Sequence, residues 1–136
     1  MNKKFWIGFV LVFVVLAILD TITSTFLLAG VYQETASLWR PEAEIKTGVI
    51  VVSWAFLAFF FTLIFSKGYK GKGIWEGVRY GLYVTGLMAI PAAYMTYATM
   101  PVPYALTFQW WVYAGITYVV MGVVLTLVYG KSAPAA

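Results

Sequence analysis

The segment LVFVVLAILDTITSTFLLAG, residues 11–30, decides the fold class of this chain. Its side chains are almost all apolar, apart from Asp20 and a few hydroxyl groups. An apolar run of about 20 residues is long enough for a helix to cross the hydrocarbon core of a bilayer. The segment therefore predicts a membrane-spanning helix that carries an acid within it.

The composition of the whole chain is also that of a membrane protein. Of its 136 residues, 62% are hydrophobic and 10% are charged, and the mean hydropathy is +0.87, whereas soluble domains carry about 25% charged residues. Cysteine and histidine are absent, which removes the thiol nucleophile, the usual general base and the usual ligands of zinc, copper and haem. We therefore expect no metal site, no cofactor and no catalytic residue.

Four apolar segments are long enough to span a bilayer. They cover about residues 5–30, 47–66, 77–99 and 109–130. Consecutive spans then cross the bilayer in opposite directions, which gives an up-down order of helices. The sequence therefore predicts an all-α fold, an integral membrane four-helix bundle. Residues 1–136 would form a single membrane domain that ends in a short tail at 131–136.

Basic residues are distributed unequally between the two sides of these segments. Seven of the nine flank the same side, whereas the first connection has mixed charge and the third has none. The positive-inside rule places the basic side in the cytoplasm, and with it both termini. This placement accounts for the net charge of +4 without a nucleic-acid partner. The seven residues are Lys3, Lys4, Lys67, Lys70, Lys72, Arg79 and Lys131.

The first segment could also be a cleaved signal peptide, because a basic start is followed by an apolar run. However, no small-x-small cleavage site follows Leu19, and apolar residues resume at 26–29. We therefore expect this segment to be retained as the first membrane helix.

The third segment carries a ridge of small side chains at strict four-residue intervals. Lipid gives helices no hydrophobic reason to associate, so close approach of backbones at small residues supplies the contact. The fourth segment has a weaker set of small residues, and the short connection makes the two segments antiparallel neighbours. We expect a seam within the chain in preference to a contact between subunits. The ridge consists of Gly73, Gly77, Gly81, Thr85, Ala89 and Ala93, and the facing set of Ala114, Gly115 and Gly122.

Pro91 lies inside the third segment, where it removes one backbone hydrogen bond and clashes with the preceding turn. Membrane helices accept such a kink when neighbouring groups satisfy the freed carbonyl. We expect a static bend, with a hinge for transport as the alternative.

Asp20 lies about ten residues from the outer end of the first segment, or about 15 Å along the helix, close to the bilayer midplane. An aspartate at that depth costs about 2.5–3.5 kcal/mol, less than the apolar residues of the same segment contribute together. The helix can therefore insert, but the acid is expected to face the other helices. The polar residues on its face or at its depth are Thr23, Ser24, Ser53, Thr85 and Tyr118, with Trp54 in the same layer.

No lysine or arginine falls in that layer, so an aspartate there is expected to favour its neutral, protonated form. Three interpretations of Asp20 stay open. It is a neutral clasp that holds helices together, a carboxylate that couples transport to protons or cations, or half of a pair that another subunit completes.

Three stretches carry a resemblance to a known group of proteins. They are ASLWRPEAEIKTG (36–48), FSKGYKGKGIWEGVRYGLYVTGLMAIPAAY (65–94) and MPVPYALTFQWWVYAGITYVVMGVVLTLVYGK (100–131). With them the chain resembles an uncharacterised family of small four-span bacterial inner-membrane proteins. The resemblance implies the four-span topology and a bacterial inner (cytoplasmic) membrane, and it implies no catalytic residue.

The function follows from these features only in outline. A long small-residue ridge and the lack of reactive side chains favour a small polytopic membrane protein that acts through helix packing. It would be an accessory subunit of a membrane complex or a homo-oligomer, with membrane lipid and a protein partner or second copy around it. The alternative is a small proton- or cation-coupled transporter centred on Asp20, and an enzyme acting on lipid or quinone ranks third.

Overall fold

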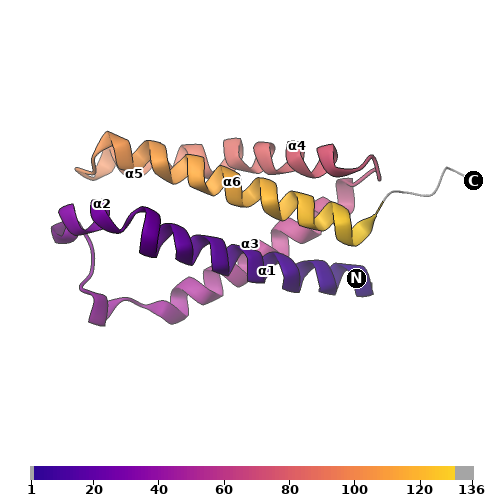
Figure 1. Cartoon of the computed structure of the whole chain (residues 1–136), viewed down its shortest axis with the longest axis horizontal. Coiled ribbons are helices and arrows are strands. Elements are labelled where there is room, and N and C mark those ends of the chain that lie inside the picture. Colours follow the sequence, from indigo (N-terminus) through magenta and orange to yellow (C-terminus); the bar gives the residue numbers. More distant parts are fainter. Residues whose placement is uncertain (1, 131–136) are drawn as a thin grey trace, which may run out of the picture.

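The computed structural model describes residues 2–130, and within that range helices are the only regular structure. The all-α class predicted from the sequence is therefore confirmed. The tail expected at 131–136, with Lys131, lies outside the described residues. In chain order the elements are α1 (Lys3–Ile22), the π-turn η1 (Thr23–Leu27), α2 (Ala29–Glu34), the 3-10 turns η2 (Ala36–Leu38) and η3 (Glu42–Glu44), α3 (Thr47–Gly68), α4 (Ile74–Val84), the π-turn η4 (Thr85–Ala89), α5 (Ile90–Thr99) and α6 (Tyr104–Tyr129) (Figure 1).

Three helical stretches are long and apolar enough to cross a membrane. They are Lys3–Leu27, Thr47–Gly68 and Tyr104–Tyr129, with 25, 22 and 26 residues. The helical stretch around the segment expected at 77–99 is not among them, because glycine, tyrosine and threonine lie between its apolar residues and lower its mean hydropathy. The three helices support a membrane protein, and the fourth crossing stays a prediction.

Some helix ends differ from those expected. α6 begins at Tyr104, ahead of the expected 109, because Pro103 has the extended backbone of a helix cap and its carbonyl accepts the first hydrogen bonds of the helix. The first helical stretch ends at Leu27, short of the expected 30, because Leu28 leaves the helical region with a φ of −108° and a ψ of 3°.

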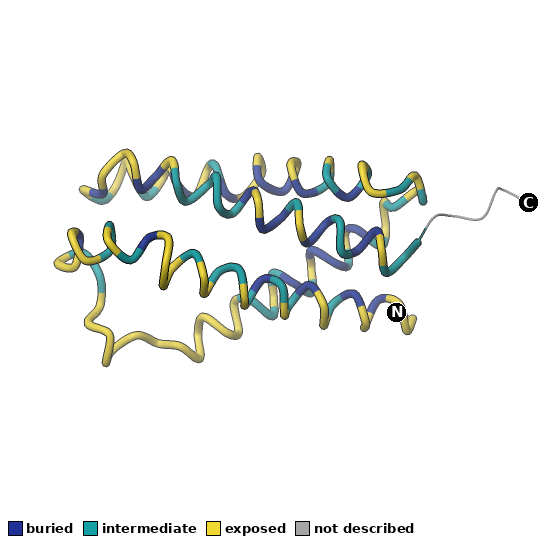
Figure 2. The backbone as a smooth tube through the Cα atoms, viewed as in Figure 1, coloured by how far each residue is buried: buried dark blue, intermediate teal, exposed yellow. Residues whose placement is uncertain are grey.

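The helices are held together by a core between α1, α3 and α6. α1 packs against both α3 and α6, and α4 packs along α6. Figure 1 shows α3 crossing α1 at an angle, with its first turns far from α6. These first turns are exposed, as the yellow tube at the start of α3 in Figure 2 shows. α3 therefore diverges from α6 on the side where α1 carries Asp20. Core side chains include Val12, Leu16, Phe61, Met121 and Leu125.

The ridge of small residues lies in the closest contact between two helices. Gly77 and Gly122 meet back to back, so that a Cβ on either would overlap the backbone of the other. A Cβ at Gly81 would lie 2.5 Å from Cα of Val119. The two backbones can approach this closely only because side chains are missing at these points. The buried members of the ridge are Gly77, Gly81, Thr85, Ala89 and Ala93.

Two residues assigned to this seam from the sequence lie elsewhere. Gly73 precedes α4 and adopts a φ of 98°, a conformation that glycine adopts without the steric cost of a Cβ. Ala114 lies on another face of α6, where it lines the cavity beside Asp20. Gly115 does face the seam, since a Cβ there would lie 3.1 Å from the methyl carbon of Thr85.

The disturbance expected at Pro91 takes the form of a π-turn. η4 directly precedes α5, in which Pro91 is the second residue. Proline has no N–H to offer to the carbonyl four residues earlier, and a π-turn lets the helix widen without ending. Helical backbone therefore continues from Ile74 to Thr99.

Candidate functional site

Asp20 lies in the last turn of α1, three residues before the π-turn η1 begins at Thr23. Its side chain is half-buried, and the indole Nε1–H of Trp54 donates a hydrogen bond of 3.1 Å to Asp20 Oδ2. This bond joins α1 to α3 at the point where α3 begins to diverge from α6. The other carboxylate oxygen, Oδ1, has no hydrogen-bond partner among residues 2–130.

Asp20 lines a cavity of about 320 Å³ between α1, α3 and α6. The volume is at the lower end of the range of about 300–1,000 Å³ that small-molecule sites occupy. Three leucines and five aromatic residues form most of the cavity wall. Apart from Asp20, its polar groups are hydroxyls and the indole N–H groups of its tryptophans. Its lining consists of Leu16, Asp20, Thr23, Ser24, Leu28, Tyr32, Trp54, Leu57, Trp110, Tyr113, Ala114, Thr117 and Tyr118.

The structure brings together four of the six polar residues proposed from the sequence. Asp20, Thr23, Ser24 and Tyr118 all line this cavity. Thr23 and Ser24 are the first two residues of the π-turn η1. Such turns often occur at functional sites.

Ser53 and Thr85 lie outside the cavity. Ser53 is exposed and lines a separate apolar groove between α3 and α4, because it is one residue, about 100° of helical rotation, away from Trp54. Thr85 is buried in the α4–α6 seam, and its hydroxyl donates a hydrogen bond of 2.7 Å to the Gly81 carbonyl. An equal residue count from the ends of the predicted spans therefore did not place these side chains on the same face.

Four polar or aromatic residues of the cavity were missed from the sequence. Trp110, Tyr113 and Thr117 follow one another on α6 at spacings of three and four residues, so a shared helix face could have identified them. Tyr32 lies on α2, a short helix beyond the apolar segment, and no periodic pattern indicates its position.

An aromatic cluster covers the α2 end of the cavity. The indole Nε1–H of Trp110 donates a hydrogen bond of 2.8 Å to the Tyr32 hydroxyl. Trp39 packs edge-on against both rings, with centroid distances of 5.5 Å to Tyr32 and 5.9 Å to Trp110. Burial raises the pKa of the Tyr32 hydroxyl, and the negative charge of Asp20 adds to the rise, against the opposing effect of the Trp110 hydrogen bond. Tyr32 therefore stays neutral at physiological pH.

The cavity lining contains a single acidic group. Asp20 is the one charged residue in its lining, which contains no lysine and no arginine. Within the described range no group of three or more acidic side chains is placed to hold a metal ion. The cavity therefore presents a single carboxylate to whatever occupies it.

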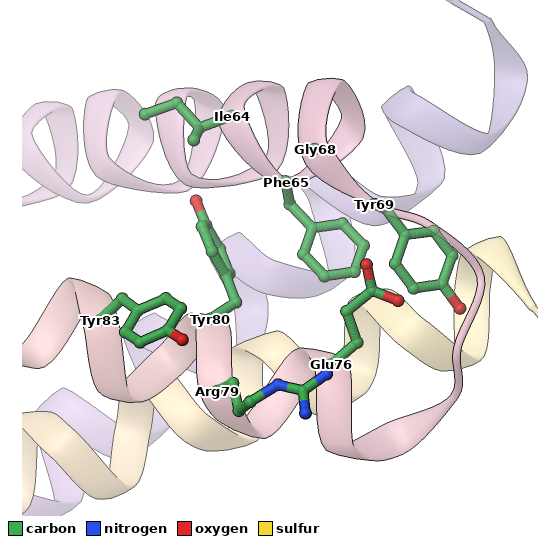
Figure 3. Close-up of a pocket in the computed structure, with 8 residues that line it drawn as sticks. All are labelled: Ile64, Phe65, Gly68, Tyr69, Glu76, Arg79, Tyr80 and Tyr83. Carbon is green, nitrogen blue, oxygen red and sulfur yellow. The ribbon is translucent and has the colours of Figure 1, made fainter.

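A second pocket, shown in Figure 3, lies between the end of α3 and α4 and contains the charged Glu76 and Arg79. Both carboxylate oxygens of Glu76 accept backbone N–H bonds, from Lys70 at 2.5 Å and from Lys72 at 2.8 Å. These bonds hold the turn between α3 and α4, so the acid has a structural role. The remaining lining is Ile64, Phe65, Gly68, Tyr69, Tyr80 and Tyr83.

Comparisons of the chain with protein-family models, curated proteins and solved structures find no match. The family resemblance drawn from the sequence therefore stays a prediction. Among the sites formed by the chain's own residues, the Asp20 cavity is the strongest candidate for function.

Proposed function

We propose that the chain crosses a bacterial inner membrane four times, as a four-helix bundle with both termini in the cytoplasm. The close approach of α4 to α6 supports the fourth crossing. Helical backbone from Ile74 to Thr99 covers about 39 Å, and its contacts pair Gly77 with Gly122 and Thr85 with Gly115. The stretch thus runs antiparallel to α6, a helix that is apolar enough to span.

Single cysteines introduced into this naturally cysteine-free chain test the topology. Lys72→Cys and Ala98→Cys place exposed thiols at opposite ends of the α4–α5 stretch. We expect a membrane-impermeant maleimide to label Ala98→Cys in intact cells, and Lys72→Cys only after permeabilisation. Labelling of both from the same side would rule out the fourth crossing, and the reverse pattern would invert the orientation.

We further propose that the protein is a small proton- or cation-coupled transporter centred on Asp20. The observation that carries this proposal is the cavity itself, in which Asp20 is the sole charge. A carboxyl in such a place holds either a proton or a cation, because an intramembrane charge without a partner is costly. If a proton and a cation bind this one carboxyl in turn, movement of one is coupled to movement of the other.

The alternative role of Asp20 as a static clasp has less support from the geometry. A clasp requires that the carboxyl be satisfied by the helices it joins. Asp20 receives one hydrogen bond, from Trp54, and its second oxygen has no protein partner among the described residues. Thr23 is partly exposed and Ser24 is exposed beside it, so the cavity is also not sealed.

The role as an accessory subunit or homo-oligomer, favoured by the sequence, rested on the lack of polar surface, the lack of reactive residues and the small-residue ridge. At Gly77 and Gly81 the ridge already contacts α6 of the same chain. It therefore offers no surface to a second protein. The oligomeric role stays a prediction, and native mass measurement of the purified protein in mild detergent tests it.

Infrared difference spectroscopy separates a titrating acid from a clasp. We expect the carbonyl band of protonated Asp20, identified as the one band that the wild-type protein has and the Asp20→Asn variant lacks, to disappear as the pH is raised. The four glutamates of the chain contribute bands that both proteins share. The tyrosines of the cavity, Tyr32, Tyr113 and Tyr118, have no carboxyl band and do not interfere. A band that depends on Asp20 but persists unchanged at high pH would show a static neutral clasp.

A further inference from the structure

We propose that the cation accommodated beside Asp20 is a small organic ammonium ion and not a bare metal ion. This inference rests on the proposed function of Asp20 and names the class of its ligand. The carboxylate attracts any cation, so the choice between classes is made by the rest of the cavity wall.

The wall is suited to a poorly hydrated cation. Ammonium ions with alkyl groups are bound in proteins by the faces of tryptophan and tyrosine, and tryptophan is the most effective of these. Two tryptophans and three tyrosines line the cavity. Leu16, Leu28 and Leu57 provide apolar surface for the alkyl groups.

The same wall is poorly suited to a bare metal ion. A hard cation needs several oxygen ligands in place of its water shell. The cavity offers one carboxylate and otherwise neutral hydroxyl groups, and the Tyr32 hydroxyl already accepts a hydrogen bond from Trp110. A sodium or calcium ion would therefore exchange a full hydration shell for few ligands.

Size and charge act in the same direction. The cavity of about 320 Å³ admits a small molecule, and no lysine or arginine in its lining competes for the carboxylate. The aromatic cluster of Tyr32, Trp39 and Trp110 covers the α2 end. A ligand that enters would thus lie between Asp20 on α1 and aromatic rings on α2, α3 and α6.

Choline chloride is a suitable probe, with 3,3-dimethylbutan-1-ol as a neutral control that replaces the nitrogen by carbon. We expect saturable binding of choline to the purified full-length protein by isothermal titration calorimetry, with quenching of tryptophan fluorescence. The neutral control is expected not to bind measurably, and sodium chloride at the same ionic strength is expected not to compete.

Two variants at one position test the contribution of the rings. Tyr113 lines the cavity, and its carbonyl, not its ring, accepts the Thr117 hydrogen bond. Tyr113→Leu is expected to weaken choline binding about fivefold, whereas Tyr113→Phe keeps the ring and is expected to bind within about twofold of wild type. Asp20→Asn is expected to weaken binding by about tenfold or more.

The outcomes separate failure of the ammonium ligand from failure of the proposed transport role of Asp20. If Asp20 titrates by infrared spectroscopy but choline does not bind, or sodium displaces it equally well, the ammonium ligand is wrong and the proton site stands. If choline binds equally well to Asp20→Asn, or to Tyr113→Leu, the proposed position of the ligand is wrong. If Asp20 neither titrates nor affects any cation, both proposals fail.

Discussion

A leucine at position 81 is expected to prevent α4 from packing on α6. A Cβ there would lie 2.5 Å from Cα of Val119 and 2.6 Å from the carbonyl oxygen of Tyr118. Both atoms belong to a helix backbone, which cannot move aside as a flexible side chain can. Overpacking among adjustable side chains costs about 1–3 kcal/mol, and we expect Gly81→Leu to exceed that range. Thermal unfolding and size-exclusion chromatography in mild detergent measure the loss.

Gly86 provides a matched control in the same helical stretch. It is exposed in η4, and a Cβ there would meet no atom within 4 Å. Gly86→Leu is therefore expected to elute and unfold like the wild-type protein. If the two variants behaved alike, whether both were stable or both were disrupted, the seam at Gly81 would not be the contact that holds these helices.

Helical periodicity explains why the ridge could be located from the sequence. Residues four apart fall on one face of a helix, so Gly77, Gly81 and Thr85 point in one direction wherever that helix packs. The facing residues on α6 follow less directly, because the register of two helices depends on both surfaces. Gly115 and Gly122 were placed on the seam, but Ala114, one residue away from Gly115, lies in the cavity.

The positions of the Asp20 site residues along their helices were predictable, but the rotation of each helix about its axis was not. Counting residues from the membrane edge brought Trp54 and Tyr118 into the layer of the acid, and both line its cavity. The same count gave Ser53 and Thr85, which face other directions. Rotation of a helix about its axis is set by its packing partners, and these are known only once the helices are assembled.

Irregular backbone explains the remaining misses. The π-turn η1 changes which direction the side chains after it face, and no residue pattern in the sequence indicates a widened turn. Tyr32 and Trp39 reach Trp110 from the segment that follows. Their meeting depends on the path of a short helix and a loop, which apolar periodicity does not describe.

The Asp20→Asn variant is expected to lose coupled transport while it keeps its fold. Asparagine has nearly the same shape as aspartate, and its side-chain oxygen can still accept the hydrogen bond that Trp54 donates to Asp20. It cannot, however, exchange a proton for a cation at physiological pH. Unchanged elution and thermal unfolding of this variant would show that a loss of transport is a loss of chemistry. Glu42→Gln, the same carboxyl-to-amide change at an exposed residue of η3, is the control.

Proton flux in proteoliposomes measures whether Asp20 couples protons to a cation. The purified protein is reconstituted with a pH-sensitive dye inside, and sodium, potassium or choline chloride is added outside at equal ionic strength. We expect the proton flux with at least one of these cations to exceed the flux in protein-free vesicles. Glu42→Gln is expected to preserve this flux, and Asp20→Asn to reduce it to the protein-free rate. Equal proton flux in wild type and Asp20→Asn, or no flux above protein-free vesicles with any of these cations, would contradict the proposed transport role of Asp20.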